Sequence, residues 1–269
     1  MDIHSTKNMQ EFLKQTIQEA GAIAKGYFDN GVTHIKTKST IGDLVTEADV
    51  AVSDFIVNKI KEAYPDHTIF SEEVGEKINE GQEYEWVIDP IDGTRNFANG
   101  IPFWCTIIAV VKNGETWLGA VYNAISGDLF FAEKGKGAFL NDIKILVNNT
   151  QSIDQAFGIM AKANKAGTYG DHIERFRVFA VNLTTNTDSW VCNYATMLAL
   201  CHVSSGGMDF FVSNAGLDWD YLAPVLIAQE AGAVATNGYG EPWTRGRQDI
   251  VVANTDLHPK VMQLFETYT

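Results

Sequence analysis

Few residues of this chain are of the kinds that build disulfide frameworks or zinc sites. Its 269 residues include three cysteines, Cys105, Cys192 and Cys201, and no Cys-x-x-Cys pair. A sparse, odd number of cysteines argues for a reducing compartment. The six histidines are scattered without the spacing of a zinc site, so we do not expect zinc.

Long apolar runs and basic clusters are also missing. The longest apolar run, residues 104–111, is interrupted by Thr106 and is too short to cross a bilayer. The N-terminus lacks the charged-then-apolar order of a signal peptide, so we expect a soluble, cytoplasmic protein that does not bind membranes. The formal net charge is −14 and no run of Lys or Arg offsets it, which argues against a nucleic-acid partner.

The hydrophobic pattern predicts two halves, residues 1–147 and 148–269. A hydrophobic content of 45% is enough for one large domain or two moderate ones. The first half should contain helices at 9–28 and 46–64, a loop at 75–85, and strands at 67–70, 86–88, 104–111, 116–122 and 128–133, the last three as an antiparallel meander. The second half should contain strands at 156–161 and 209–212, helices at 171–180 and 195–203, and a helix capped by Asp218 or Asp220 that ends at Gly232.

The most informative stretch is residues 85–97, EWVIDPIDGTRNF. The apolar run Trp-Val-Ile predicts a short strand, and Asp89 and Asp92 follow directly after it. Pro90 cannot continue a central ladder, and Gly93 permits a turn after which backbone N–H groups are free to receive an anion. Two carboxylates and an anion-binding turn therefore follow one strand, which suits a metal and a phosphate together.

Asp89 and Asp92 would repel each other in such a turn. At about 4 Å and an effective dielectric of 20 the repulsion is roughly 4 kcal/mol, so we expect a cation between them. Ligands that are all oxygen favour Mg²⁺, Mn²⁺ or Ca²⁺ over zinc. Other interpretations compete: the spacing does not fit an EF-hand, an aspartyl-phosphate motif (Asp-x-Asp-Gly-Thr) is one residue shorter, and a simple turn with surface acids stays open.

Other carboxylates lie at element boundaries. Glu72 follows the strand at 67–70, and because strand ends in one sheet lie side by side, it could meet Asp89; a solvated loop is the alternative. Thr46 and Asp49 fit a capping box, which by itself would explain Asp49. A capping role would likewise explain Asp220, although Trp219 beside it is bulky enough to fix the direction of the carboxylate.

In this order the motifs resemble the inositol monophosphatase superfamily of metal-dependent, lithium-sensitive phosphomonoesterases. The segments that carry the resemblance are DLVTEAD (43–49), SEE (71–73), WVIDPIDGTRNF (86–97), GKGAFLN (135–141), WD (219–220) and EAG (230–232). The resemblance implies an α/β (α+β) fold, a layered αβαβα sandwich of the inositol monophosphatase and fructose-1,6-bisphosphatase type. It also implies an active site between an N-terminal α+β half and a C-terminal α/β half, and a homodimer.

The resemblance implies two to three Mg²⁺ ions. One would bind Glu72, Asp89 and the Ile91 carbonyl, a second would bind Asp89, Asp92 and Asp220, and a third would lean on Glu72. Mn²⁺ would substitute for Mg²⁺, and Li⁺ and Ca²⁺ would inhibit. Divalent ions about 3.5 to 4 Å apart can neutralise both the entering and the leaving oxygen of a phosphate ester.

The resemblance also implies how substrate and water are held. Gly93 and Thr94 would offer backbone N–H groups to the phosphate, and the Thr94 hydroxyl with Asp49 would orient and deprotonate the attacking water, which overrides a capping-only role for Asp49. Glu72 would take part in the same catalysis. The implied substrate contacts are Asp92, Gly93, Thr94, Thr196, Ser213 and Asp220.

The implied substrate is a small soluble phosphate monoester, with inositol 1-phosphate favoured. Ser213 stands where inositol monophosphatases often carry an acidic residue, and residues 192–196 lack the family's small Gly-Ser/Thr-Ala run. The stretches around 92–104 and 188–190 also resemble histidinol-phosphate phosphatases, the main alternative. Fructose 1,6-bisphosphate, NADP and 3′-phosphoadenosine 5′-phosphate would need more cationic contacts. A regulatory interaction protein with residual activity is the alternative from a different class.

Overall fold

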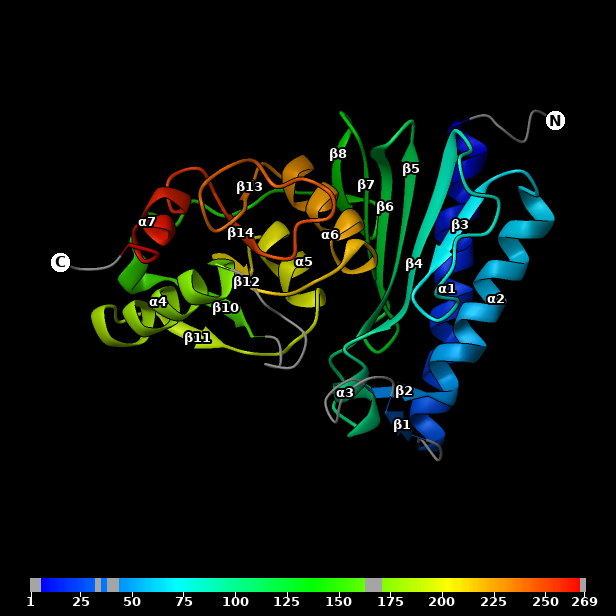
Figure 1. Cartoon of the computed structure of the whole chain (residues 1–269), viewed down its shortest axis with the longest axis horizontal. Helices are drawn as coiled ribbons and strands as arrows, with labels where there is room; N and C mark the ends of the chain where they lie inside the picture. Colours follow the sequence, from blue (N-terminus) through cyan, green and yellow to red (C-terminus); the bar gives the residue numbers. More distant parts are fainter. Residues whose placement is uncertain (1–5, 32–34, 38–43, 163–170, 267–269) are drawn as a thin grey trace.

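Helices and sheets alternate in five layers (Figure 1). The computed structural model describes residues 6–31, 35–37, 44–162 and 171–266. The first layer is a pair of long helices, α1 (Thr6–Asn30) and α2 (Glu47–Ala63), which pack on each other and on the first large sheet. Both helices were predicted, and the layer order confirms the αβαβα sandwich.

The first large sheet has seven strands in the order β3-β4-β5-β6-β7-β8-β9. These are β3 (Thr68–Ser71), β4 (Tyr84–Asp92), β5 (Cys105–Lys112), β6 (Glu115–Asn123), β7 (Asp128–Glu133), β8 (Gly137–Leu140) and β9 (Ile143–Ile145). β3 is parallel to β4 and the other neighbours are antiparallel. Positive φ at both Asn113 and Gly114 makes the tight turn from β5 to β6, so the predicted meander is confirmed.

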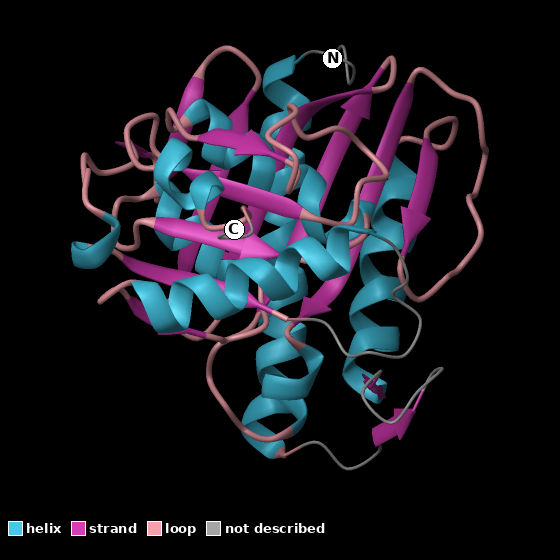
Figure 2. Cartoon of the chain, turned by 60° about the vertical axis from the view of Figure 1, so that its left-hand side comes forward, coloured by secondary structure: helices cyan, strands magenta, loops and turns pink. Residues whose placement is uncertain are grey.

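The second large sheet has five strands in the order β11-β10-β12-β14-β13. These are β10 (Phe157–Ala161), β11 (Trp190–Cys192), β12 (Phe210–Ser213), β13 (Val234–Thr236) and β14 (Ile250–Ala253). β10 is parallel to β11 and to β12, so the carboxyl ends of these three strands share one edge. The strands of this sheet run across those of the seven-stranded sheet (Figure 2).

Helices α5 (Leu198–Ser204) and α6 (Asp218–Glu230) form the layer between the two sheets. α6 packs on β5, β6 and β7 of one sheet and on β13 of the other, and one apolar core contains residues of both sheets. Helices α4 (Asp171–Asn186) and α7 (His258–Gln263) cover the outer face of the five-stranded sheet. Within the described ranges, none of the helices is both long and apolar enough to cross a bilayer.

Some predicted boundaries were wrong. The helix expected at 195–203 begins at Leu198, because Ala195 has a φ of 49°, outside the helical region. The N-cap of α6 is Leu217, so neither aspartate at the start of that helix is the N-cap. The elements that were not predicted are short: β1 (Ile35–Thr37), β2 (Leu44–Thr46), β8, β9, β11, β13, β14, α3 (Thr94–Ala98), the 3-10 helix η1 (Ile153–Gln155) and α7. Asp43, part of one motif, lies outside the described residues.

The chain leaves the seven-stranded sheet after β9 and enters the five-stranded sheet with β10. α6 belongs to the second half by sequence but packs on the sheet of the first half. The division into 1–147 and 148–269 therefore stays a prediction, since the shared core joins the two halves.

α6 packs so closely on β6 at Gly119 that a side chain there would contact the helix backbone. A Cβ at Gly119 would lie 2.9 Å from the carbonyl oxygen of Ala223 and 3.0 Å from its Cα, and helix backbone cannot give way as a side chain can. We expect Gly119→Ala to lower the free energy of unfolding by roughly 1–3 kcal/mol, measured by urea titration.

Gly26→Ala is the matched control for this change. Gly26 lies inside α1 and its Cβ would meet nothing within 4 Å. The same substitution should therefore raise the free energy of unfolding, by roughly 0.5–1 kcal/mol. Equal stability of the two variants would contradict the packing of α6 on β6.

Candidate functional site

A β-bulge turns two aspartates of β4 to the same face of the sheet. In a regular strand, residues three apart point to opposite faces. Asp89 pairs with Ile107 and Asp92 with Cys105, so β4 has one residue more than β5 across this stretch. Pro90 lies inside the bulge, where its missing N–H removes no ladder hydrogen bond.

The core residues on either side of the bulge show which face this is. Val87 belongs to the apolar cluster that contains α6, and Ile88 to the cluster that contains α1 and α2. Asp89 continues this alternation toward α6. Ile91 returns to the α1 and α2 side, so Asp92 points toward α6 as well. The expectation that Pro90 interrupts the ladder is confirmed, and the interruption aligns the two carboxylates.

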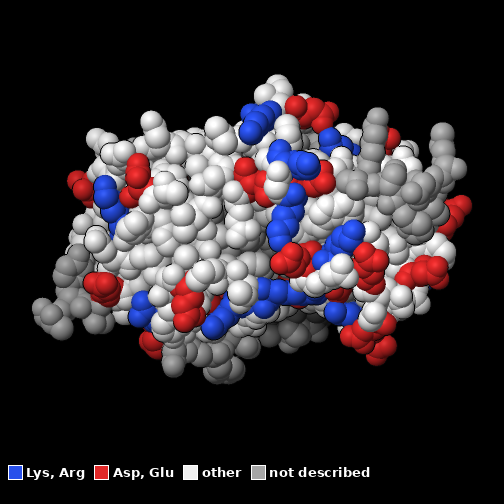
Figure 3. All heavy atoms as spheres, turned by 90° about the horizontal axis from the view of Figure 1, so that it is seen from above, with Lys and Arg blue, Asp and Glu red and all other residues white. Residues whose placement is uncertain are grey.

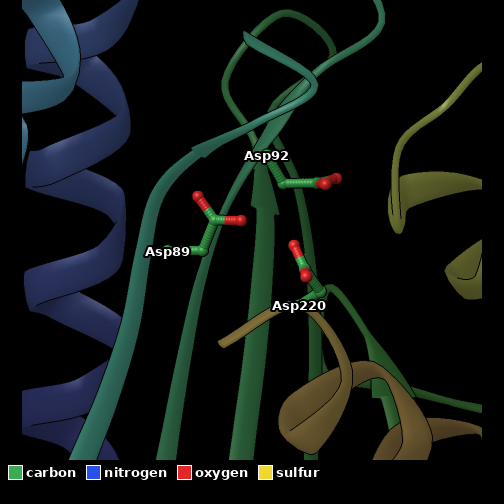
Figure 4. A group of neighbouring side chains, drawn as sticks. All are labelled: Asp89, Asp92 and Asp220. Carbon is green, nitrogen blue, oxygen red and sulfur yellow. The ribbon is translucent and has the colours of Figure 1, made fainter. Parts of the chain in front are cut away.

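The start of α6 adds the third aspartate. One carboxylate oxygen from each of Asp89, Asp92 and Asp220 lies within 4.8 Å of the other two, and the three side chains converge on one space (Figure 4). The Asp220 carboxylate also accepts a hydrogen bond from the Leu217 backbone N–H at 2.5 Å, which orients it at the beginning of the helix. These residues come from two segments that are more than a hundred positions apart in the sequence.

Glu72 lies at the same edge of the sheet. In the parallel pair of β3 and β4, Ser71 is opposite Ile88, and the Glu72 backbone N–H donates to the Ile88 carbonyl at 3.1 Å. The half-buried Glu72 carboxylate is one of the charges that raise the pKa of Asp89. Glu72 is therefore near enough to Asp89 for their charges to interact, and its role as a metal ligand stays a prediction.

The cluster carries more negative charge than its own hydrogen bonds compensate. Burial first, and then the charges of Glu72 and Asp92, raise the pKa of Asp89 well above its usual range. Burial and the neighbouring Asp92 raise the pKa of Asp220 to about 8. Within the described part of the chain, the buried Oδ1 of Asp89 has no hydrogen-bond partner. A buried carboxylate oxygen without a donor is a ready ligand for a cation.

Asp92 differs from Asp89 because one of its oxygens is fully used. Its Oδ2 accepts hydrogen bonds from the Thr196 hydroxyl, the Met197 backbone N–H at 2.6 Å and the Cys105 thiol at 3.3 Å. Burial raises the pKa of Asp92 to about 6, while these three donors act to lower it. Cys105 and Met197 were not predicted, because no motif marks either residue. Thr196 was expected to contact substrate, yet its buried hydroxyl is bonded to Asp92.

The turn after β4 brings Thr94 close to Asp49. Gly93 has a φ of 86°, and a Cβ there would lie 3.2 Å from the Thr196 Cβ, so the turn requires glycine. The Thr94 hydroxyl donates to the Ile91 carbonyl at 3.0 Å and lies 3.5 Å from Asp49 Oδ1. A hydroxyl, a carboxylate and a main-chain carbonyl therefore meet beside the three aspartates.

Asp49 also caps α2 with its other oxygen. Its Oδ2 accepts hydrogen bonds from the Thr46 backbone N–H at 2.8 Å and from the Thr46 hydroxyl at 2.5 Å, which confirms the predicted capping box. Asp49 is 1% exposed, so this cap holds the carboxylate in one orientation. The cap leaves Oδ1 directed to Thr94, so a capping role and a role at the site are compatible.

Ser213 lies in the five-stranded sheet, whereas Asp89 and Asp92 lie in the seven-stranded sheet. It is the last residue of β12 and is 3% exposed. Its hydroxyl accepts a hydrogen bond from the Ala215 backbone N–H at 3.4 Å. The expected contact of Ser213 with substrate stays a prediction.

The donor set fits a hard divalent cation. Asp89, Asp92 and Asp220 supply only oxygen atoms, and Glu72 and the Ile91 carbonyl lie beside them. Mg²⁺ and Ca²⁺ prefer such ligands, and Zn²⁺ sites contain His or Cys in most proteins. The thiol of Cys105 lies beside Asp92, and burial raises its pKa. Because zinc binds the thiolate form, this raised pKa disfavours zinc binding by Cys105.

Comparisons with known proteins find similarity over most of the chain. Residues 5–269 match the model of the inositol monophosphatase family. The inositol-1-monophosphatase of Bacillus subtilis is 31% identical over 97% of this chain and 96% of its own, and the Nus factor SuhB of Pasteurella multocida is 34% identical over 81% and 80%. The solved structure of an IMPase from Thermotoga maritima superposes with a TM-score of 0.84 at 28% identity, covering 96% of each chain. The chain therefore belongs to the inositol monophosphatase family.

Proposed function

We propose that this protein is a Mg²⁺-dependent phosphatase that hydrolyses a small soluble phosphate monoester, with inositol 1-phosphate as its substrate. The observation that carries the proposal is the cluster of the buried Asp89 and Asp92 with the half-buried Asp220, next to the turn at Gly93 and Thr94. An uncompensated group of carboxylates attracts cations, and a helix start beside it suits a phosphate. On the family resemblance, we also propose that it acts in the cytoplasm as a homodimer.

Two to three Mg²⁺ ions are proposed at the cluster. Glu72, Asp89 and the Ile91 carbonyl would hold one ion, and Asp89, Asp92 and Asp220 a second, while Glu72 would also support a third. When bound, such ions neutralise charge on the phosphate oxygens and lower the pKa of water. Mn²⁺ is proposed as a substitute, and Li⁺ and Ca²⁺ as inhibitors.

The chain's own groups would bind the phosphate and handle the proton. The backbone N–H groups of Gly93 and Thr94 begin α3 and are proposed to bind the phosphate oxygens. The Thr94 hydroxyl and Asp49 Oδ1 are proposed to orient the attacking water and to accept its proton. The capping box fixes Asp49 before substrate arrives, so no reorientation of this carboxylate is needed.

Different observations support two substrates. Inositol 1-phosphate is supported by the relatives named as inositol monophosphatases. Ser213, which stands where many of them carry an acidic side chain, instead supports histidinol phosphate as the first alternative. Phosphate esters with further charged groups, such as fructose 1,6-bisphosphate, NADP and 3′-phosphoadenosine 5′-phosphate, rank lower.

A regulatory role in an assembly is a second candidate. It is supported by relatives that carry the name Nus factor SuhB. Over the face drawn in Figure 3, basic and acidic side chains are interleaved among the coloured residues, which does not favour direct contact with a nucleic-acid backbone. The partner in such a role would therefore be a protein. Affinity purification with the unmodified chain and with the Asp89→Asn variant tests this. A partner retained by both would support it.

Asp89→Asn and Asp220→Asn test the metal assignment. Each change removes one charged ligand, so we expect phosphate release to fall below detection and the Mg²⁺-dependent rise in Tm to disappear. Because each change also removes repulsion in the metal-free cluster, the Tm without metal should be no lower than that of the unmodified protein. The control is Asp142→Asn, which removes an exposed carboxylate paired with Lys14. Near-normal turnover in either cluster variant would refute the assignment.

Thr94→Val and Thr94→Ser separate the hydroxyl from the shape of the side chain. Valine keeps the shape of threonine but cannot donate to Asp49, so we expect kcat to fall about 10²- to 10⁴-fold with little change in KM. Serine keeps the hydroxyl and should retain most of the activity. Equal loss in both variants would indicate a packing effect at the start of α3 rather than proton transfer.

A substrate panel tests the proposed specificity. Phosphate release with Mg²⁺ is measured from inositol 1-phosphate, histidinol phosphate, fructose 1,6-bisphosphate, NADP and 3′-phosphoadenosine 5′-phosphate. We expect the highest kcat/KM with inositol 1-phosphate. A preference for histidinol phosphate would replace the substrate and leave the metal chemistry intact. No release from any of the five, with Mg²⁺ still bound, would favour the regulatory role.

A further inference from the structure

Arg245 connects two elements of the site from outside it. It lies on the segment between β13 and β14. Its Nε donates to Asp218 Oδ2 at 2.6 Å, and its two terminal nitrogens donate to the two carboxylate oxygens of Glu85 at 2.7 and 3.1 Å. The guanidinium therefore binds Glu85 with both ends of its fork and Asp218 with the remaining nitrogen, a geometry that lysine cannot reproduce.

The two partners of Arg245 are close in sequence to the clustered aspartates. Asp218 is the first residue of α6, two positions before Asp220. Glu85 is in β4, four positions before Asp89. The Gly246 backbone N–H also donates to the second oxygen of Asp218, at 3.0 Å. The segment around Arg245 thus ties the beginning of α6 to the strand that carries the other two aspartates.

A second chain of contacts closes the connection through β3. Lys77 pairs with Glu85 at 2.8 Å and lies over the ring of Phe70 in β3. Phe70 packs edge-on against Trp219 of α6, with the ring centroids 5.3 Å apart. Trp219 stands between Asp218 and Asp220 in the sequence. The segments that carry Glu72 and the three clustered aspartates, β3 with the residue after it, β4 and α6, are therefore joined at this one network.

The network is shielded enough to be more than a surface ion pair. The side chain of Glu85 is 12% exposed, that of Asp218 21% and that of Arg245 28%. Burial by itself would raise the pKa of Glu85, but the hydrogen bonds from Arg245 and Lys77 lower it below its usual value. Exposed pairs contribute little, whereas breaking a partly buried, bidentate pair leaves a charge without a partner.

Arg245 also lines a cavity of about 480 Å³ beside α6, where its positive charge could bind an external anion. The other cation that lines this cavity, Lys134, is paired with Glu115 at 2.7 Å. Arg245 is engaged by two carboxylates of the same chain. Both cations are therefore already paired with carboxylates of this chain, which disfavours binding of an external anion. The contacts of Arg245 instead support a role in connecting α6 to β4.

We infer that Arg245 is a positioning residue: through Asp218 and Glu85 it holds the start of α6 against β4, so that Asp220 stays within ligand distance of Asp89 and Asp92 despite their mutual repulsion. The inference rests on the proposed metal site. Without this tie, the acids would separate in the metal-free protein, and a cation would have to bring α6 back before it could bind all three. The cost would appear as weaker metal binding, with the chemistry at saturating metal largely unchanged.

The test compares Arg245→Met, Arg245→Lys and Asp218→Asn with Arg247→Met, the matched control. Arg247 is 50% exposed and lies 3.5 Å from Glu241, away from the acids that Arg245 binds. Affinity for Mg²⁺, and separately for Mn²⁺, is measured by calorimetry on the full chain without substrate, and kcat is measured at saturating Mg²⁺. We expect Arg245→Met and Asp218→Asn to weaken Mg²⁺ binding by about 10- to 100-fold, as loss of a residue that orients metal ligands does.

The remaining outcomes decide between a positioning role and a merely structural one. Arg245→Lys should bind Mg²⁺ more tightly than Arg245→Met but less tightly than the unmodified protein. Arg247→Met should bind Mg²⁺ as tightly as the unmodified protein. In every variant, kcat at saturating Mg²⁺ should stay close to that of the unmodified protein. Arg245 variants that lose thermal stability but bind Mg²⁺ as the unmodified protein does would overturn the inference. If the unmodified protein binds Mg²⁺ but hydrolyses none of the five esters, and Arg245→Met still weakens binding, the phosphatase proposal fails and the positioning role stands.

Discussion

Mutual repulsion among buried carboxylates is the constraint on which the rest of this structure depends. Asp89, Asp92 and Asp220 converge within 4.8 Å, with Glu72 beside them, at the point where two strands end and one helix begins. Each pair at such a distance costs several kcal/mol at a protein-like dielectric. The surrounding fold must therefore hold the segments together without the help of the acids themselves. The packing of α6 on β6 at Gly119 and the ion pairs of Arg245 both act in that direction.

The carboxylates are not equivalent, and the difference follows from their neighbours. Asp92 has three donors on one oxygen, and Asp49 has two donors from its capping box, so both are fixed in direction. Asp89 instead keeps a buried oxygen without a donor in the described structure. The bulge at Pro90 explains why strand geometry allows this arrangement, since without the extra residue Asp92 would point into the α1 and α2 core. Asp92 and Asp49 are thus held by hydrogen bonds, whereas Asp89 has an oxygen available to bind a cation.

Sequence patterns revealed the centre of the site and most of its supports. The turn signals around Pro90 and Gly93, the helical spacing of α1 and α2, and the parallel strand ends that bring Glu72 to Asp89 all depend on local rules, so they could be predicted. The contacts of Cys105, Met197 and Arg245 could not, because each joins segments far apart in the chain and none belongs to a motif. Short edge strands such as β9 and β13 were missed for a different reason, because three residues carry too little periodicity to be recognised.

The two halves of the fold supply different parts of the site. The acids come from β4, from the residue after β3 and from the first turns of α2 and α6, where the bulge, the cap and the ion pairs leave little freedom. The residues expected to face the remainder of the substrate lie after β11 and at the end of β12, whose carboxyl ends share an edge with that of β10. Loops and strand ends of this kind accept substitution more easily than a charged, buried cluster does. Ser213 can therefore differ from the acidic residue that the family resemblance implies at this position without any change at Asp89.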